Sequence, residues 1–354
     1  MMVANSDGDG VYDREFFLGH IDPHSSPESI LYWNQEFRST IWGHMTLLNL
    51  KHLVEPIFTG FKHTTHPHDH PMNADIADHV HDQQGHVNYT HPAHNQRDPY
   101  AGAYTAKELP IDVALGKVDS IDVMSNQNAN MEVWYRLLNC GLRLPASAGT
   151  DCFLNRIPST LPGAVRVYVH CPNEISYASW VRNLQAGRTF VTNGPMLRLT
   201  VNGQEPGSEI KLQAPAALSI VASVVSRSPI DSVELVVNGR PENLLSTAET
   251  AQSTQNGKSI RVEHQVKLIA SSWVAIRVKN NAGAFAHTRP VYVYVADNPI
   301  HSSEDAAYFL AWIDRLRGDV RKRNQLPPRF VLPVEEQLAK AAEYYRRQTD
   351  NKPK

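Results

Sequence analysis

Histidine is the residue type in this sequence most able to do chemistry. The chain has 17 histidines among 354 residues, and nine of them fall between His63 and His94. In the segment 86–91, Val87 and Tyr89 alternate as in a short strand. The following Pro92 cannot continue a hydrogen-bonded ladder, so we expect His91 where the strand becomes a loop. A neutral imidazole there can ligate a divalent metal ion. An ordinary polar loop residue is the alternative.

A carboxylate and a second imidazole precede this segment. Residues 36–39 and 41–48 are predicted to be two strands separated by a turn, and they place Glu36 and His44 at strand edges. On these residues alone, a surface acid and a hydrogen-bonded imidazole are the simpler interpretation.

The remaining histidines favour loop and helix surfaces. The tract 63–70 is predicted to be a loop because prolines and small polar residues flank it. Such a tract can bind divalent ions adventitiously, with His68 the candidate for a supporting role. His79 and His81 lie two apart on a predicted helix, so they point to different sides and cannot share one ion.

Composition excludes several classes of partner. The formal charge is −2, which offers no electrostatic footprint for nucleic acid or for an anionic membrane surface. No apolar run reaches the roughly 20 residues that span a bilayer. The first ten residues lack a charged region followed by an apolar core, so they do not predict a signal peptide. The chain as written is therefore expected in the cytoplasm, or exported if a signal segment precedes it.

Two further motifs are weak. The run from Asp7 to Gly10 resembles part of a calcium loop without its closing glutamate, and is interpreted as a turn. The three cysteines, at 140, 152 and 171, are too few and too irregular for a disulfide framework or a Cys-rich zinc site. Cys152, beside Asp151, could be a nucleophile, but a buried structural cysteine is the simpler interpretation.

The first half of the chain alternates helical and strand patterns. Ser26-Pro27-Glu28 predicts a helix start, with a capping serine followed by proline. Further helices are predicted at 105–116, 130–139 and 177–186, and strands at 118–124, 144–148 and 165–169. This regular order favours a parallel α/β layer or barrel.

The pattern changes near residue 195. Short Val/Ile-rich runs separated by turns extend from 197 to 295, with Asn-Gly pairs at 202, 238 and 256, and predict an antiparallel β-sandwich. Helices follow at 303–317 and 334–347. The predicted domains are therefore 1–195 (barrel), 196–298 (immunoglobulin-like sandwich) and 299–354 (helical tail).

Several short segments occur in an order typical of one family. They are Glu36, Trp42-Gly43-His44, Tyr89-Thr90-His91-Pro92, Ser147-Ala148-Gly149-Thr150-Asp151, Pro162-Gly163 before Arg166-Val167-Tyr168-Val169, and the run from Gly187 to Pro195. Together they resemble the CehA/McbA-like branch of the polymerase and histidinol phosphatase (PHP) superfamily of metal-dependent hydrolases, over roughly residues 15–300.

The resemblance implies a distorted (β/α)₇ barrel with divalent ions, Zn²⁺, Mn²⁺ or Fe²⁺, at the carboxyl ends of its strands. By resemblance, Glu36 takes the position of the bridging carboxylate, and His44 that of the histidine after it. His91 matches the His-Pro ligand and Asp151 the terminal aspartate. Such ions lower the pKa of water to about 7 and polarise a scissile group.

Two family features are missing. Nothing before Glu36 supplies the acidic-x-His-x-His strand, because His20 and His24 have the wrong spacing, and Phe153 stands where the family has a histidine. We therefore expect an incomplete PHP-type barrel. Either its first strand lies upstream, or the chain is a degenerate relative. An incomplete barrel exposes strand edges, which favours a homo-oligomer.

The resulting expectation is a hydrolase that acts on a small ester, carbamate or phosphoester. His94 is the candidate proton shuttle, and Arg188 could contact an anionic substrate group or simply belong to a turn. Asn126 and Asn128 could line a pocket or cap a loop. The alternative is a non-catalytic scaffold whose sandwich binds a glycan or a partner protein. The substrate does not follow from the sequence.

Overall fold

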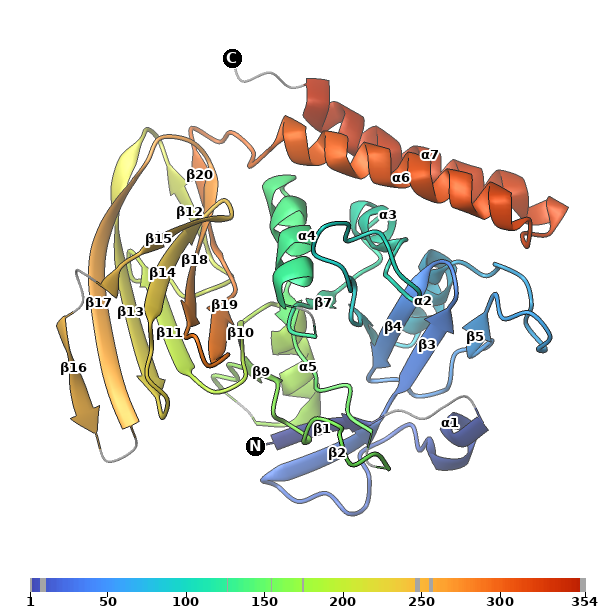
Figure 1. The fold of residues 1–354 in the computed structure, drawn as a ribbon, viewed down its shortest axis with the longest axis horizontal. Coiled ribbons are helices and arrows are strands. Elements are labelled where there is room, and N and C mark those ends of the chain that lie inside the picture. Colours follow the sequence, from blue (N-terminus) through green and yellow to red (C-terminus); the bar gives the residue numbers. More distant parts are fainter. Residues whose placement is uncertain are drawn as a thin grey trace.

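The chain has a mixed α/β architecture. The computed structural model describes residues 2–6, 11–125, 127–153, 155–173, 175–245, 249–254 and 257–350, and within them several sheets and seven helices. The predicted turn at Asp7–Gly10 and the predicted pocket residue Asn126 lie outside the described residues. In Figure 1 the sandwich and the first sheet stand on either side of one helix, α4 (Gln127–Asn139).

A six-stranded sheet carries the segments singled out above. Its strands are β3 (Gln35–Ser39), β4 (Gly43–Leu48), β5 (Phe58–Thr59), β6 (His86–Tyr89), β7 (Ser120–Asp122) and β8 (Ala146–Ser147). Their order is β5-β3-β4-β6-β7-β8. In the part of the chain described, no pairing joins β5 to β8, so this sheet is open.

The prediction of a parallel layer, made from the strands at 118–124 and 144–148, is confirmed for β7 and β8, and the sheet continues beyond β6 with antiparallel strands. β3 pairs antiparallel with β4, and β4 antiparallel with β6, while β6-β7 and β7-β8 are parallel. The connection from Thr40 to Trp42 explains the antiparallel pairing of β3 with β4, because so short a link can only reverse the chain into a hairpin, whereas a parallel pair needs a crossover.

Apolar side chains of this sheet pack against helices on one side. α2 (Asn73–Asp82) and α3 (Leu109–Ala114) cover it together with α4. Large, fully buried side chains in this core include Phe37, Trp42, Tyr89 and Trp134. α3 begins later than predicted, with Pro110 in its first turn, where the missing N–H costs nothing. The tract 63–70 contains turns and bends, as predicted.

The predicted helix after Ser26 was wrong. Residues Ser29–Trp33 form a strand, β2, that pairs in parallel with β1 (Met2–Ser6) near α1 (Val11–Phe16). Burial alternates along β2, and Tyr32 stacks on Tyr177 of α5 (Tyr177–Gln185) with ring centroids 4.2 Å apart. Burial therefore has the period of two that a strand shows, although the apolar residues themselves form a continuous run.

The predicted sandwich is present. One sheet pairs β11 (Met196–Val201), β13 (Ala216–Ser226), β17 (Gly257–Leu268) and β16 (Glu249–Thr254). The other holds β12 (Glu209–Leu212), β14 (Ser232–Val237), β15 (Arg240–Asn243), β18 (Ser272–Lys279), β19 (Phe285–Thr288) and β20 (Val291–Val295). The turns at Asn202-Gly203 and Asn238-Gly239 have positive φ at both residues, as two-residue hairpins require.

Strand pairing crosses the predicted boundary at residue 195. β9 (Arg166–Val169) and β10 (Thr189–Thr192) pair antiparallel with each other, and β10 pairs with β19 of the sandwich. The strand predicted at 165–169 is therefore part of the sandwich sheet, where it pairs antiparallel with β10, and not of a parallel layer. Gly187, at φ +65°, leaves room for the Arg289 guanidinium, which donates to the Ala186 carbonyl.

Two long antiparallel helices complete the chain. α6 (Ser303–Arg323) and α7 (Pro328–Asp350) are longer than predicted and lie across α3 and α4 (Figure 1). Asp69 is completely buried and accepts hydrogen bonds from Arg323 at 3.0 and 2.9 Å, which ties the end of α6 to the loop before α2. Within the described ranges no helix is both long and apolar enough to cross a bilayer.

Candidate metal centre

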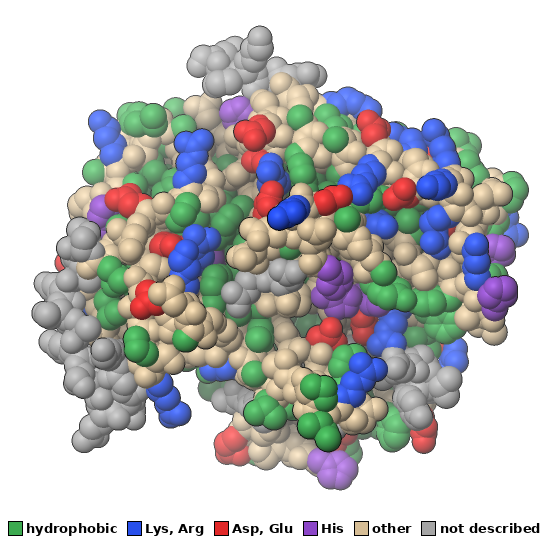
Figure 2. Space-filling view, viewed as in Figure 1, with side chains coloured by type: hydrophobic (Ala, Val, Ile, Leu, Met, Phe, Trp, Pro, Cys, Tyr) green, Lys and Arg blue, Asp and Glu red, His purple; other side chains and the backbone are tan. Residues whose placement is uncertain are grey.

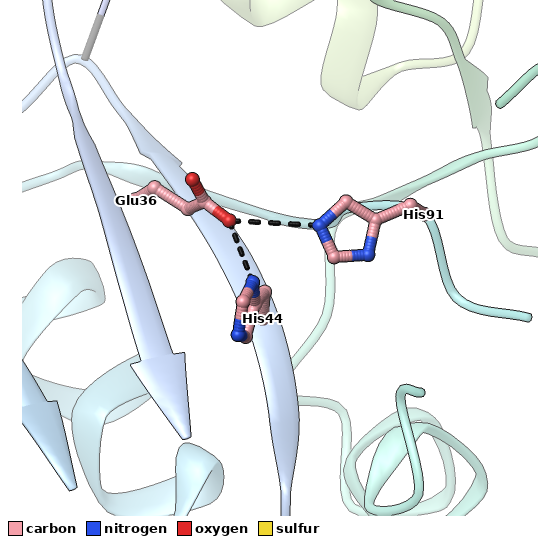
Figure 3. A group of neighbouring side chains, drawn as sticks. All are labelled: Glu36, His44 and His91. Atoms are coloured by element: carbon pink, nitrogen blue, oxygen red, sulfur yellow. Dashed lines mark hydrogen bonds and ion pairs between the residues drawn. The ribbon is translucent and has the colours of Figure 1, made fainter. Parts of the chain in front are cut away.

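Three of the predicted ligands meet in space. Glu36, His44 and His91 are all buried, and each offers one ligand atom within 4.8 Å of the other two. One carboxylate oxygen of Glu36, Oε1, lies 2.7 Å from His44 Nδ1 and 3.6 Å from His91 Nε2. Figure 3 shows both imidazoles turned toward this one oxygen. Among the described residues this is the one such group of His, Cys, Asp or Glu.

Strand register brings these residues together. His44 of β4 lies opposite Arg38 of β3, and Glu36 is two residues from Arg38 on the same face. Glu36 and His44 are therefore diagonal neighbours across the hairpin, a spacing that long side chains bridge. The Thr90 amide donates to the His44 carbonyl and carries the pairing to the residue before His91.

Backbone conformation at the strand ends is unusual. His91 has φ +33° and Asp151 has φ +45°, in a left-handed region that non-glycine residues rarely adopt. Such conformations collect at functional sites, where the surrounding structure holds them. Gly43, at φ +109°, lets the start of β4 approach the backbone of Ala106, which a Cβ atom would meet at 2.5 Å.

The carboxylate of Glu36 is held in its charged form. Burial raises its pKa, but the hydrogen bond with His44, the nearby His91 imidazole and the positive charge that both rings can carry outweigh burial and lower the pKa to about 2. Arg38 adds a further hydrogen bond to the second oxygen, Oε2, at 2.7 Å. Glu36 is thus an anion near neutral pH, as a metal ligand must be.

The pKa values of the two imidazoles shift in opposite directions. Burial lowers the pKa of His44, and the charges of His91 and Arg38 lower it further, against the effect of Glu36. Burial also disfavours the charged form of His91, but the nearby Glu36 carboxylate and the charge of Asp151 raise the pKa of His91. His44 is therefore the imidazole more readily available as a neutral ligand.

The donor set fits a divalent cation. Two imidazole nitrogens and a carboxylate suit Zn²⁺, Mn²⁺ or Fe²⁺. His44 Nε2 is buried and has no hydrogen-bond partner, which is costly for a polar atom unless something else occupies it. Glu36, His44 and His91 would hold such an ion. Its binding would replace the hydrogen bond between Glu36 Oε1 and His44 Nδ1.

Asp151 and His94 lie beside the cluster without joining it. Asp151 is exposed and outside the 4.8 Å group, although its charge raises the pKa of both His91 and His94. The His94 ring lies 5.3 Å from the His91 ring, centroid to centroid. Burial lowers the pKa of His94, and the charges of His91 and His44 lower it further. His94 is consequently a neutral base near pH 7.

Arg188 belongs to another part of the molecule. Its guanidinium donates to Asn183 at 2.9 Å and its carbonyl accepts from the His170 amide, at the turn between α5 and β10. None of these contacts involves the cluster. The cation that does touch the cluster is Arg38, which sequence reasoning missed. The signal was its spacing, because a residue two after Glu36 on a strand shares its face.

Two further residues were also missed. Asp122, at the carboxyl end of β7, is fully buried, and burial raises its pKa while the charge of His91 opposes that effect. Tyr104 places its ring 4.9 Å from the His44 ring and 6.5 Å from Phe61. Asp122 follows a buried strand, a position from which it could have been predicted. Nothing local to Tyr104 indicates its contact with His44.

The face of the molecule seen in Figure 2 is mixed in charge. Figure 2 shows a group of histidine side chains beside acidic ones near the centre of the visible face. Elsewhere on this face cationic and anionic side chains alternate, most densely over the two long helices.

A large cleft lies between α4, the sandwich and the start of α6. Its volume is about 950 Å³, and its lining includes Asn128, Tyr135, Arg240, Phe285 and Glu304. Gln96, two residues after His94, reaches its edge. The predicted pocket residue Asn128 therefore lines this cleft.

Comparison with known proteins adds no family to these observations. The sequence matches no protein-family model and no curated protein.

Proposed function

We propose that this chain is a metal-dependent hydrolase of the PHP type that uses metal-activated water on an ester, carbamate or phosphoester. The observation that carries the proposal is the buried convergence of Glu36, His44 and His91 on one carboxylate oxygen. The resemblance to CehA/McbA-like proteins supports it, since three ligand positions implied by that resemblance are the three that meet. In this proposal the open sheet is an incomplete (β/α)₇ barrel.

Four residues at the candidate centre have separate roles in the proposed hydrolysis. A divalent ion, when bound, supplies Lewis-acid chemistry toward a carbonyl or phosphoryl oxygen and makes water a better nucleophile. Glu36 stays ionised to hold the ion, and Arg38 orients its second oxygen. His94 accepts a proton from the attacking water, because its lowered pKa leaves it neutral at pH 7. The negative charge of Asp151 then favours the protonated form of His94.

Metal analysis of the purified protein tests the proposal. After loading with Zn²⁺, Mn²⁺ or Fe²⁺ and dialysis, the wild-type chain should retain about one ion. Glu36→Gln and His91→Ala should each weaken binding at least ~10-fold, because the buried donor set loses a member. His79→Ala, on the exposed side of α2, is the matched control and should bind as wild type does.

Hydrolysis of p-nitrophenyl esters and of bis-p-nitrophenyl phosphate by the loaded protein should fall with metal content. A chain that retains no ion, or variants that all bind equally because the 63–70 tract holds the metal, would contradict the proposal.

A second candidate function rests on the cleft. A volume of about 950 Å³ between α4 and the sandwich is in the range of ligand-binding sites, and such sites favour interfaces between structural units. This observation favours a scaffold whose sandwich side binds a glycan or a protein segment. Arg240→Glu, on the exposed rim of the cleft, would abolish that binding while leaving metal content unchanged.

A further inference from the structure

A cluster of four polar side chains lies completely buried behind the candidate metal centre. It consists of Asn73 on α2, Tyr89 on β6, Glu108 before α3, and Asp112 on α3, each with no exposed surface. We refer to these four residues as the buried acid cluster. Removing two carboxyl groups from water costs folding free energy, and a role for the cluster would explain why the fold bears that cost.

Hydrogen bonds connect the four residues into one network. The Tyr89 hydroxyl donates to Asp112 Oδ2 at 2.6 Å and accepts from Asn73 Nδ2 at 2.9 Å. The two oxygens of Glu108 accept the amides of Asn73 and Ala74 at 2.9 and 3.2 Å. Burial raises the pKa of both Glu108 and Asp112, and the charge of Asp112 raises the pKa of Glu108 further.

The network reaches both strands that carry the imidazoles. Asn73 Nδ2 donates to the carbonyl of Gly43, the residue before His44, at 3.2 Å. The Glu108 amide donates to the Trp42 carbonyl at 3.0 Å. On the other strand, Tyr89 is two residues before His91, which follows the last residue of β6 into the loop. One buried network thus holds the backbone on the approach to each imidazole.

We propose that the buried acid cluster positions His44 and His91 relative to each other, so that Asn73, Tyr89, Glu108 and Asp112 are positioning residues of the metal centre. The inference rests on the proposed function for its effect on metal binding. Its effect on the imidazoles themselves does not need the metal. None of the four touches the candidate ligands, so they act through the backbone of β4 and β6.

The test replaces one hydroxyl in the network. Tyr89→Phe removes the donor to Asp112 and the acceptor for Asn73 while keeping the ring. Tyr345→Phe is the matched control, because Tyr345 is equally buried and its hydroxyl donates to the Pro110 carbonyl of α3 at 2.7 Å, outside the network. Both variants lose one buried hydroxyl and should lose similar thermal stability.

The first readout is the ¹⁵N–¹H imidazole correlation spectrum of the metal-free, histidine-labelled protein. Tyr89→Phe should shift the His44 and His91 signals, and Tyr345→Phe should leave them at wild-type positions. The second readout is Co²⁺ binding followed by its visible absorption. Tyr89→Phe should weaken Co²⁺ binding ~10-fold and alter the spectrum, whereas the control should do neither.

Asp112 supplies the rescue experiment. Asp112→Asn keeps an oxygen that accepts the Tyr89 hydroxyl and should retain the imidazole spectrum, whereas Asp112→Ala should shift it. Imidazole signals that stay in place in Tyr89→Phe and in Asp112→Ala would overturn the inference. Wild-type protein that binds no Co²⁺ while the signals do shift would instead overturn the proposed function alone.

Discussion

At the scale of single residues, the candidate centre depends on a carboxylate that two imidazoles and a guanidinium surround. Glu36 is stabilised as an anion by His44, His91 and Arg38, despite its burial. A folded-state pKa below the unfolded value contributes stability above the unfolded pKa, and that stability is lost as the pH falls through the folded pKa. Acid pH should therefore destabilise the metal-free protein through this residue.

We expect Glu36→Gln to remove that part of the acid sensitivity. Between pH 4.5 and about pH 2 the difference in unfolding free energy between wild type and variant should shrink by about 3 kcal/mol, the equivalent of the shift in pKa. Urea unfolding of the metal-free proteins across this interval measures the difference. Glu304→Gln, at an exposed position on α6, is the control and should follow the wild-type curve. If the free energies of unfolding of Glu36→Gln and wild type change with pH in parallel, ionised Glu36 does not stabilise the folded state.

At the scale of elements, an ion pair with a buried carboxylate attaches the hairpin of α6 and α7 to the rest of the chain. Asp69 has no exposed surface, and Arg323 in the last turn of α6 donates to both of its oxygens. Bidentate pairing of this kind is geometrically specific. It joins the C-terminal hairpin to the loop that leads into α2, the helix that carries Asn73.

Arg323→Ala should cost about 3–5 kcal/mol of unfolding free energy, because Asp69 remains buried without its partner. Arg321→Ala in the same helical turn removes an exposed pair with Glu335 and should change stability by less than about 1 kcal/mol. Chemical denaturation of the two variants measures both values. Equal effects of the two substitutions would exclude a buried role for the Arg323 pair.

At the scale of the whole molecule, α4 joins the first sheet to the sandwich. The Tyr135 hydroxyl donates to His287 Nε2 at 2.6 Å, and the Trp273 indole donates to Asn139 at 2.7 Å. Burial lowers the pKa of His287 to about 3, so this imidazole is neutral and its Nδ1–H donates to the Thr288 carbonyl. Buried, fully paired hydrogen bonds such as these favour a single placement of the first sheet relative to the sandwich.

Tyr135→Phe should destabilise the chain by about 1–3 kcal/mol, because it leaves His287 Nε2 buried without a donor. Tyr308→Phe, whose half-buried ring packs under the Arg136 guanidinium at 4.4 Å, keeps that contact and should have little effect. Calorimetry also reports whether the junction couples the two parts, since Tyr135→Phe should then split one unfolding transition into two. A single transition with wild-type midpoint would contradict both expectations.

The local patterns in the sequence predicted much of this architecture. Period-two alternation and Asn-Gly pairs predicted the sandwich and its hairpins, and helical periodicity predicted α2, α4, α5 and the C-terminal helices. Helix boundaries and strand partners were predicted less well. Ser26-Pro27-Glu28 is a good helix start, yet β2 follows it, because pairing with β1 and packing on Tyr177 outweigh a cap worth about 1 kcal/mol.

The sequence by itself determined which residue types could bind a metal, and it placed His91 where a strand gives way to a loop. Only the tertiary structure decided that Glu36, His44 and His91 meet, that Asp151 stays outside their group, and that Arg188 lies elsewhere. The physical reason is that strand register sets distances between residues far apart in the chain, and register depends on packing over the whole sheet.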